Sequence, residues 1–241
     1  MNLSPMPISP TPVSPHQAQV PAILGILFDL DGVIVHTDRF HRQASQRLAQ
    51  EEGLHFDPSL GDALRGVSRM ASLDLLLEKA GAPNRYQVEE KLALADRKNT
   101  YYRAFLQELT PDDFAPRHRR ALQALREAGY KLGIASSSKN ASFILDRLAL
   151  LDAFDTITDG TDIQHSKPHP EVFLKAADKL GLPPSDLMVV EDAEAGLEAA
   201  HAGNFLAAGF GPAAHSELAL YRFEDLDALF TFFQVSQGAC D

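Results

Sequence analysis

The chain has 241 residues, of which 45% are hydrophobic and 23% charged, and its formal net charge is -11. This composition is typical of a globular protein and excludes a disordered, collagen-like or low-complexity chain. The negative charge argues against nucleic-acid binding, because neutralising a phosphate backbone needs clustered cations. The single cysteine, Cys240, excludes an intramolecular disulfide and favours a reducing cytoplasm. No apolar run is long enough to span a bilayer, so we expect a cytoplasmic protein with neither a nucleic-acid nor a membrane partner.

Residues 1–21 are rich in proline and poor in apolar side chains. They lack the basic start and the apolar centre of a signal peptide. We predict that they form a disordered extension with polyproline II character. A docking tail is the alternative interpretation of the same composition.

Short, continuously apolar runs predict strands that are buried on both faces. Four such runs occur, at residues 23–28, 130–135, 187–190 and 205–208. Helical patterns separate them: helices open at Pro116 and Pro170, and a third extends over residues 193–203. This alternation predicts an α/β fold with a Rossmann-like parallel-sheet core. We interpret Gly209-Phe210-Gly211 as a turn that follows the last strand.

The stretch at residues 37–109 breaks the alternation, because it contains no convincing strand. Apolar residues lie at helical spacing near its start, and a long helical pattern continues through Leu92 and Tyr102. We predict that this stretch is an α-helical cap domain, inserted into a catalytic core of residues 22–36 and 110–241.

Two acidic residues follow the first predicted strand, in the sequence Asp29-Leu30-Asp31-Gly32. Ligands of open α/β sheets bind beyond the carboxyl ends of strands, so Asp29 lies where chemistry is expected. Two carboxylates this close repel unless a cation or a proton separates them, which is how a metal site or an acid–base pair arises. The alternative is simple turn chemistry, because Asp-Gly is a common turn signal.

Polar residues also follow the later strands. The string Ser136-Ser137-Ser138-Lys139-Asn140 combines hydroxyls, an amide and an ammonium before a helix, which favours either an anion site or helix capping. Pro168 restricts the backbone of Lys167 in a short loop, although a solvated surface lysine is the alternative. Glu191 and Asp192 can complete a hard-cation site, or they can simply favour the first turn of a helix.

In this order and strand context, these signals resemble the haloacid dehalogenase superfamily of phosphoryl-transfer enzymes over residues 23–211. The resemblance implies that Asp29 is a nucleophile that becomes an aspartyl-phosphate, and that Asp31 is the general acid and base. It also implies that Ser136 and Lys167 hold phosphate oxygens. The implied cofactor is Mg²⁺, and the implied metal-binding residues are Asp29, Asp31, Glu191 and Asp192.

Three further motifs are similar to those of the β-phosphoglucomutase family within that superfamily. They are Gly66-Val67-Ser68-Arg69 at a break between cap helices, Arg97-Lys98-Asn99 on the long helix, and Ser138-Lys139-Asn140 in the core. The resemblance implies that Arg69 binds the phosphate that is not transferred and that Lys98 supports acid–base positioning. The full set of implied substrate-binding residues is Thr37, His41, Gly66, Val67, Ser68, Arg69, Lys98, Ser136, Ser138, Lys139, Asn140 and Lys167.

The resemblance leads us to expect an enzyme that interconverts β-D-glucose 1-phosphate and glucose 6-phosphate through an aspartyl-phosphate and a sugar bisphosphate. A sugar-phosphate phosphatase with the same core is the alternative. A non-catalytic phosphosugar-binding protein is a third hypothesis, but it has no need for an acid–base aspartate beside a nucleophile. The expected partner is a small phosphosugar, and we expect a monomer.

Overall fold

The computed structural model describes residues 22–60 and 69–237. The predicted extension at residues 1–21 lies outside this part of the chain, as do Gly66, Val67 and Ser68 of the predicted cap loop. Among the described residues, no helix is both long and apolar enough to cross a membrane.

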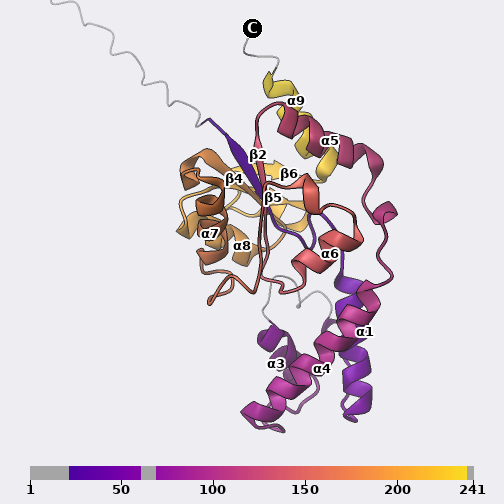
Figure 1. Cartoon of the computed structure of the whole chain (residues 1–241). Helices are drawn as coiled ribbons and strands as arrows, with labels where there is room; N and C mark the ends of the chain where they lie inside the picture. The colour runs from indigo at the N-terminus through magenta and orange to yellow at the C-terminus, as the bar shows by residue number, and fades with distance from the viewer. Residues whose placement is uncertain (1–21, 61–68, 238–241) are drawn as a thin grey trace, which may run out of the picture.

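The described residues form a six-stranded sheet in the order β3-β2-β1-β4-β5-β6, in which every neighbouring pair is parallel (Figure 1). The strands are β1 (Gly25–Phe28), β2 (Lys131–Ala135), β3 (Thr156–Thr158), β4 (Leu187–Glu191), β5 (Leu206–Phe210) and β6 (Tyr221–Phe223). The chain winds outward from β1 to β3 and then crosses to β4 on the other side of β1. The carboxyl ends of β1 and β4 therefore meet at the switch point where open α/β sheets bind ligands.

All four predicted strands are present, and the predicted fold class is confirmed. The two edge strands β3 and β6 were not predicted, because three residues each are too few to make a recognisable apolar run. The predicted turn at residues 209–211 is wrong in part, since Gly209 and Phe210 belong to β5 and another strand follows. Close packing explains the glycine at position 209, because a Cβ there would lie 2.1 Å from the carbonyl oxygen of Ala213.

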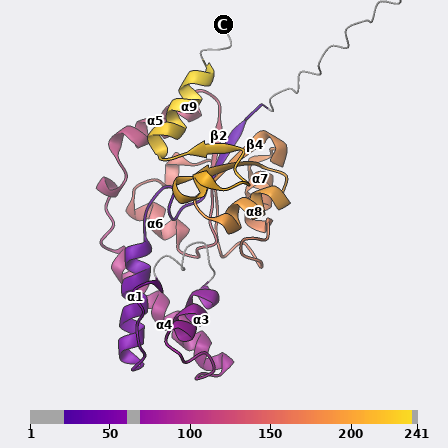
Figure 2. The ribbon, with the colours of Figure 1, turned by 180° about the vertical axis from the view of Figure 1, so that it is seen from behind.

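Helices cover both faces of the sheet (Figure 2). On one face lie α5 (Pro116–Glu127), α6 (Ala141–Arg147) and α9 (Leu226–Gln237), and on the other lie α7 (Glu171–Leu180) and α8 (Glu194–Ala202). The helix ends follow the predicted signals: α5 begins at Pro116, and α7 begins after Pro170 and ends at Gly181, which has a φ of 68°. Gly181 is favoured there because a side chain at positive φ is strained.

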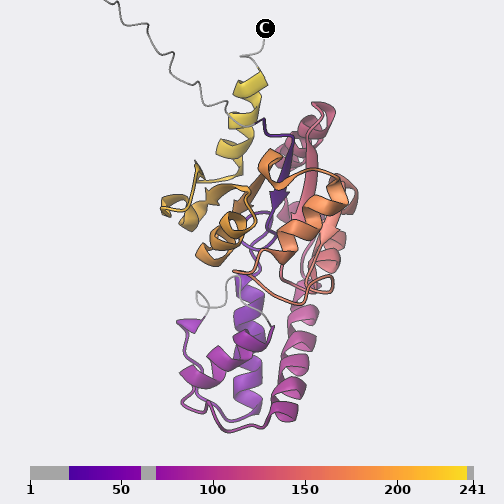
Figure 3. The ribbon, with the colours of Figure 1, turned by 90° about the vertical axis from the view of Figure 1, so that its left-hand side faces the viewer.

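The other α-helices in the described part of the chain lie beyond the carboxyl edge of the sheet and form a separate group (Figure 3). They are α1 (Asp38–Glu51), α3 (Arg69–Lys79) and α4 (Val88–Leu106). Their apolar faces share a hydrophobic cluster of their own, which includes Leu48, Leu73 and Leu94. This arrangement is consistent with a helical cap, and its boundaries at residues 37 and 109 stay a prediction.

Candidate active site

Asp29 lies immediately after β1, at the carboxyl edge of the sheet. Its backbone N–H donates to the carbonyl oxygen of Val190 at 2.9 Å, which holds the start of the loop against β4. Only 7% of the residue is exposed. A carboxylate removed from water in this way needs charged or hydrogen-bonding partners, and other loops at the same edge supply them.

Three buried carboxylates converge at this point. Asp29, Glu191 and Asp192 each offer an oxygen, and these atoms lie within 4.8 Å of one another. Two glycines leave room for them: a Cβ at Gly32 would lie 1.9 Å from Asp192 Oδ2, and a Cβ at Gly196 would lie 1.9 Å from Glu191 Oε1. A side chain at either glycine would therefore displace a carboxylate.

Lys167 is the cation at this cluster. Its Nζ donates to Asp29 Oδ1 at 2.5 Å and to Glu191 Oε2 at 3.1 Å, and 1% of its side chain is exposed. Burial opposes the ammonium charge, but the carboxylates of Asp29 and Glu191 outweigh burial and raise the pKa of Lys167. Burial, followed by the charge of Asp29, raises the pKa of the Glu191 carboxyl well above its usual value.

The donor set fits a hard divalent cation. Three carboxylates against one ammonium leave a formal charge of -2 in a buried pocket, which a divalent ion would neutralise. All three candidate ligands are oxygens, the ligand type that Mg²⁺ prefers. Asp29, Glu191 and Asp192 are therefore the carboxylates that could hold this ion.

Asp31 has a different environment from these three residues. It does not belong to the group of converging carboxylates, and its Oδ1 accepts a hydrogen bond from the hydroxyl of Thr37. The Thr37 hydroxyl in turn lies 2.8 Å from the hydroxyl of Tyr102 on α4. Burial is the largest cause that raises the pKa of Asp31, to about 7. A carboxyl group with this pKa can both give and take a proton near neutral pH.

The metal role predicted for Asp31, together with Asp29, Glu191 and Asp192, stays a prediction. The Asp31 carboxylate accepts a hydrogen bond from Thr37 at the junction with α1, and it lies close enough to Asp29 and Asp192 for their charges to contribute, after burial, to its raised pKa. The positive φ of 91° at Gly32 turns the chain directly after Asp31. Asp29 and Asp31 are two residues apart, but their carboxylates contact different partners: Asp29 contacts Lys167, and Asp31 contacts Thr37.

A cavity of about 370 Å³ opens beside Asp29 and Asp31, and both the core and the cap line it. It brings together most of the residues predicted for the site. These are Asp29, Asp31, His41, Arg69, Lys98, Ser136, Ser138, Lys139, Asn140 and Lys167.

The loop after β2 forms one wall of this cavity. The Oγ of Ser136 accepts a hydrogen bond from the N–H of Ser138 at 3.2 Å, and the Oγ of Ser138 accepts one from the N–H of Asn140 at 3.2 Å. The Asn140 side chain then joins the core to α4, because it donates to Asn99 at 2.9 Å and accepts from Arg103 at 3.1 Å. The loop thus both lines the cavity and fixes the position of the cap helix over it.

Two basic groups reach the cavity from the cap. Lys98 is buried, donates to the hydroxyl of Ser72, and has a pKa lowered by burial to about 8, so it stays mostly protonated at pH 7. His41 stacks on Tyr102 with 3.8 Å between the ring centroids. Burial, followed by the charge of Lys98, lowers the pKa of His41 to about 3, so its imidazole is neutral.

Arg69 opens α3 and lines the cavity from the cap side. Its Nη1 donates to Asp96 Oδ1 at 2.9 Å, and the two side chains are 32% and 75% exposed, respectively. An exposed ion pair of this kind contributes little stability, so the guanidinium can exchange the carboxylate for another anion at small cost.

The chain can be compared with known proteins at this point. A profile of the haloacid dehalogenase-like hydrolase family matches residues 23–204. The chain belongs to this family. The superfamily resemblance seen in the sequence is therefore confirmed.

Among curated relatives, a β-phosphoglucomutase of Bacillus subtilis is 39% identical over 204 residues, which are 83% of this chain and 90% of the relative. Fructose-1-phosphate phosphatase YqaB of Escherichia coli is 30% identical over 185 residues, which are 74% of this chain and 91% of the relative. The crystal structure of a β-phosphoglucomutase from Clostridium difficile superposes with a TM-score of 0.81 at 34% identity, and covers 90% of this chain and 98% of that one.

Two polar side chains of α4 that line the cavity, Tyr102 and Asn99, were not predicted as site residues from the sequence. Tyr102 was assigned only to the apolar spacing of a helix, whereas its hydroxyl contacts Thr37. Asn99 belongs to a motif that was singled out, but no role was assigned to it. The sequence could have indicated Tyr102, because it lies four residues after Lys98 and therefore on the same face of the helix. Arg97 of that motif ion-pairs with Glu52 inside the cap and does not line the cavity.

Proposed function

We propose that this enzyme is a magnesium-dependent phosphosugar mutase, which interconverts β-D-glucose 1-phosphate and glucose 6-phosphate. The observation that carries the proposal is the presence of basic groups on both sides of one cavity. Lys167 lies on the core side beside Asp29, and Arg69 lies on the cap side. A sugar bisphosphate carries two phosphates and needs a cation for each of them. The β-phosphoglucomutases among the relatives support the same conclusion.

The nucleophile in this proposal is Asp29. Its carboxylate oxygen attacks the phosphorus, and the bond between phosphorus and the sugar oxygen breaks, which gives an aspartyl-phosphate. Lys167 holds phosphoryl oxygens with its ammonium group, as it holds the carboxylates of Asp29 and Glu191 in this structure. Mg²⁺, held by Asp29, Glu191 and Asp192, would neutralise further charge on those oxygens.

Asp31 moves the protons. When the phosphoryl group passes from Asp29 to the hydroxyl at carbon 6 of β-glucose 1-phosphate, the Asp31 carboxylate accepts the proton of that hydroxyl. After the sugar bisphosphate reorients, the phosphate of carbon 1 passes to Asp29, and Asp31 returns the proton to the departing oxygen. The product is glucose 6-phosphate, and Asp29 is again phosphorylated. The pKa of about 7 suits Asp31 to both steps.

The cap residues orient the substrate and the proton carrier in this scheme. Thr37 fixes one oxygen of Asp31, and Tyr102 fixes Thr37. Lys98 carries its charge into the cavity, and the neutral His41 keeps the neighbouring space free of a second cation. Arg69 exchanges Asp96 for the phosphate that is not being transferred.

A sugar-phosphate phosphatase is the second candidate, because the relatives include a fructose-1-phosphate phosphatase that is 30% identical. The two activities differ only in whether a sugar hydroxyl or water accepts the phosphoryl group from Asp29. The test is to incubate the enzyme with β-glucose 1-phosphate, Mg²⁺ and a trace of the bisphosphate, and to follow glucose 6-phosphate and free phosphate together. The mutase predicts glucose 6-phosphate with little free phosphate. Free phosphate alone would show a phosphatase, and neither product across a panel of phosphosugars would favour a binding protein.

A further inference from the structure

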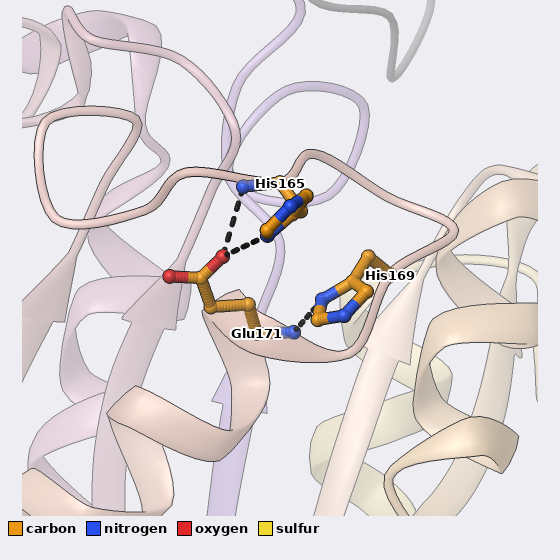
Figure 4. Close-up of side chains that lie close together, drawn as sticks. All are labelled: His165, His169 and Glu171. Carbon is orange, nitrogen blue, oxygen red and sulfur yellow. Dashed lines mark hydrogen bonds and ion pairs between the residues drawn. The ribbon is translucent and has the colours of Figure 1, made fainter.

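A second group of ligand-type side chains lies on the loop that carries Lys167. His165, His169 and Glu171 approach one another there, at the start of α7 (Figure 4). Both histidines are exposed, and the Glu171 side chain is 15% exposed. His165 Nδ1 lies 3.1 Å from Glu171 Oε2, and each of the three residues offers one ligand atom within 4.8 Å of the other two.

We propose that these three side chains bind a transition-metal ion of the Zn²⁺ class, separately from the buried carboxylates. The donor set decides the type of ion. Two imidazoles and one carboxylate suit Zn²⁺, Ni²⁺ or Cu²⁺, whereas Mg²⁺ prefers a set made only of oxygens. Three protein ligands leave a fourth position of a tetrahedral ion to water.

The geometry needs only a small rearrangement to close around an ion. Ligand atoms at about 2.0–2.2 Å from a tetrahedral Zn²⁺ lie about 3.5 Å from one another. The present separations exceed this value by little more than about 1 Å, which rotation of an exposed side chain can remove. The His165 nitrogen already lies at ligand–ligand distance from the Glu171 oxygen.

Glu171 is held in a state that suits a metal ligand. Lys175 contacts its Oε1 at 2.8 Å, and the backbone N–H of His165 donates to its Oε2 at 2.8 Å. These contacts fix the carboxylate in place, and its Oε2 faces the imidazole of His165.

The two histidines of the proposed site flank Lys167, so a bound ion would restrain the loop that carries this active-site lysine. His165 lies two residues before Lys167, and His169 lies two residues after it. An ion bound by both histidines closes a short ring around the residue whose ammonium contacts Asp29 and Glu191. We expect this ring to stabilise the loop, since an ion that binds only the folded chain raises its melting temperature.

The test is calorimetric titration of the tag-free full chain with Zn²⁺, in buffer that already holds saturating Mg²⁺ so that the carboxylate cluster is occupied. The variant is His165→Ala/His169→Ala. The matched control is His215→Ala, which removes an exposed histidine that pairs with Glu224 at 4.0 Å. Melting temperatures without Zn²⁺ show that all three proteins are folded.

We expect one Zn²⁺ site whose affinity falls by more than about tenfold in the double variant, because removing even groups that only support a metal ligand costs that much. The control is expected to keep the affinity of the unaltered protein. Zn²⁺ is also expected to raise the melting temperature of the unaltered protein and of His215→Ala, but not that of the double variant. Equal Zn²⁺ affinity in the double variant, or an equal loss in the control, would overturn the proposal. These outcomes do not depend on which phosphosugar reaction the enzyme catalyses.

Discussion

The buried ammonium charge of Lys98 lowers the free energy of unfolding, and the size of this effect can be predicted. Burial lowers its pKa from 10.5 to about 8. At about 1.4 kcal/mol per pKa unit, the charged form is disfavoured in the folded state by about 3 kcal/mol. Lys98→Met removes this penalty and loses the hydrogen bond from the ammonium to Ser72, which is worth about 1.5–3 kcal/mol because the donor is charged. We therefore expect the variant to be at least as stable as the unaltered protein, and more stable by up to about 1.5 kcal/mol at pH 7, or by up to about 3–6 °C in melting temperature.

The same substitution is expected to lower mutase turnover by about 10- to 100-fold, because it removes the ammonium charge that Lys98 brings to the cavity, and a charged hydrogen bond there would be worth about 1.5–3 kcal/mol. Urea denaturation and steady-state kinetics measure the two effects. Since the folded-state pKa is depressed, the penalty is complete below pH 8 and fades as the pH rises towards 10.5. The gain in stability of the variant must fade with it. Lys79→Met, at an exposed position in the last turn of α3, is the control and should change stability by less than about 0.5 kcal/mol. A variant at Lys98 that is less stable than the unaltered protein would refute the reasoning.

Four further substitutions and treatments test other parts of the site. Gly196→Ala places a Cβ on the Glu191 carboxylate, so the Mg²⁺ concentration that half-saturates activity should rise at least about tenfold, and an unchanged value would contradict the proposed ligand. Arg69→Ala should reduce mutase efficiency by about 10- to 100-fold but reduce hydrolysis of acetyl phosphate much less; equal losses would mean that Arg69 supports only the fold or cap closure. Tyr102→Phe releases Thr37, and we expect kcat to fall about fivefold with KM nearly unchanged, whereas a change in KM alone would place Tyr102 in substrate binding. Chelation of divalent ions should abolish turnover and added Mg²⁺ should restore it; full activity in chelator would rule out the metal.

The parallel sheet explains why so much of the site can be predicted from the sequence. Strands with continuous apolar runs are easy to recognise, and their carboxyl ends must meet at one edge. Asp29, Ser136 and Glu191 each follow such a strand, so their convergence needs no knowledge of side-chain geometry. Lys167 is less certain from sequence alone, because it lies on a loop, yet the structure brings its Nζ to Asp29.

The features that sequence patterns miss depend on how a helix or a turn is rotated. Asp31 lies two residues from Asp29, and its carboxylate accepts a hydrogen bond from Thr37, a partner that the sequence pattern does not indicate. Tyr102 has the spacing of an apolar helix residue, and only the packing of α4 against α1 brings its hydroxyl to Thr37. The edge strands β3 and β6 are set by pairing with a neighbour and not by an apolar pattern of their own.

The most direct test of the central claim, transfer through phosphorylated Asp29, is an isotope crossover experiment. One portion of β-glucose 1-phosphate carries heavy carbon in the sugar, and a second portion carries heavy oxygen in the phosphate. The two are mixed, converted by the enzyme with Mg²⁺, and the glucose 6-phosphate is analysed by mass spectrometry. Because each sugar receives the phosphoryl group left on Asp29 by the previous one, the account predicts that the two labels are scrambled in the product, and that Asp29→Asn forms none. Product in which every sugar keeps its own phosphate, or free phosphate in place of glucose 6-phosphate, would contradict it.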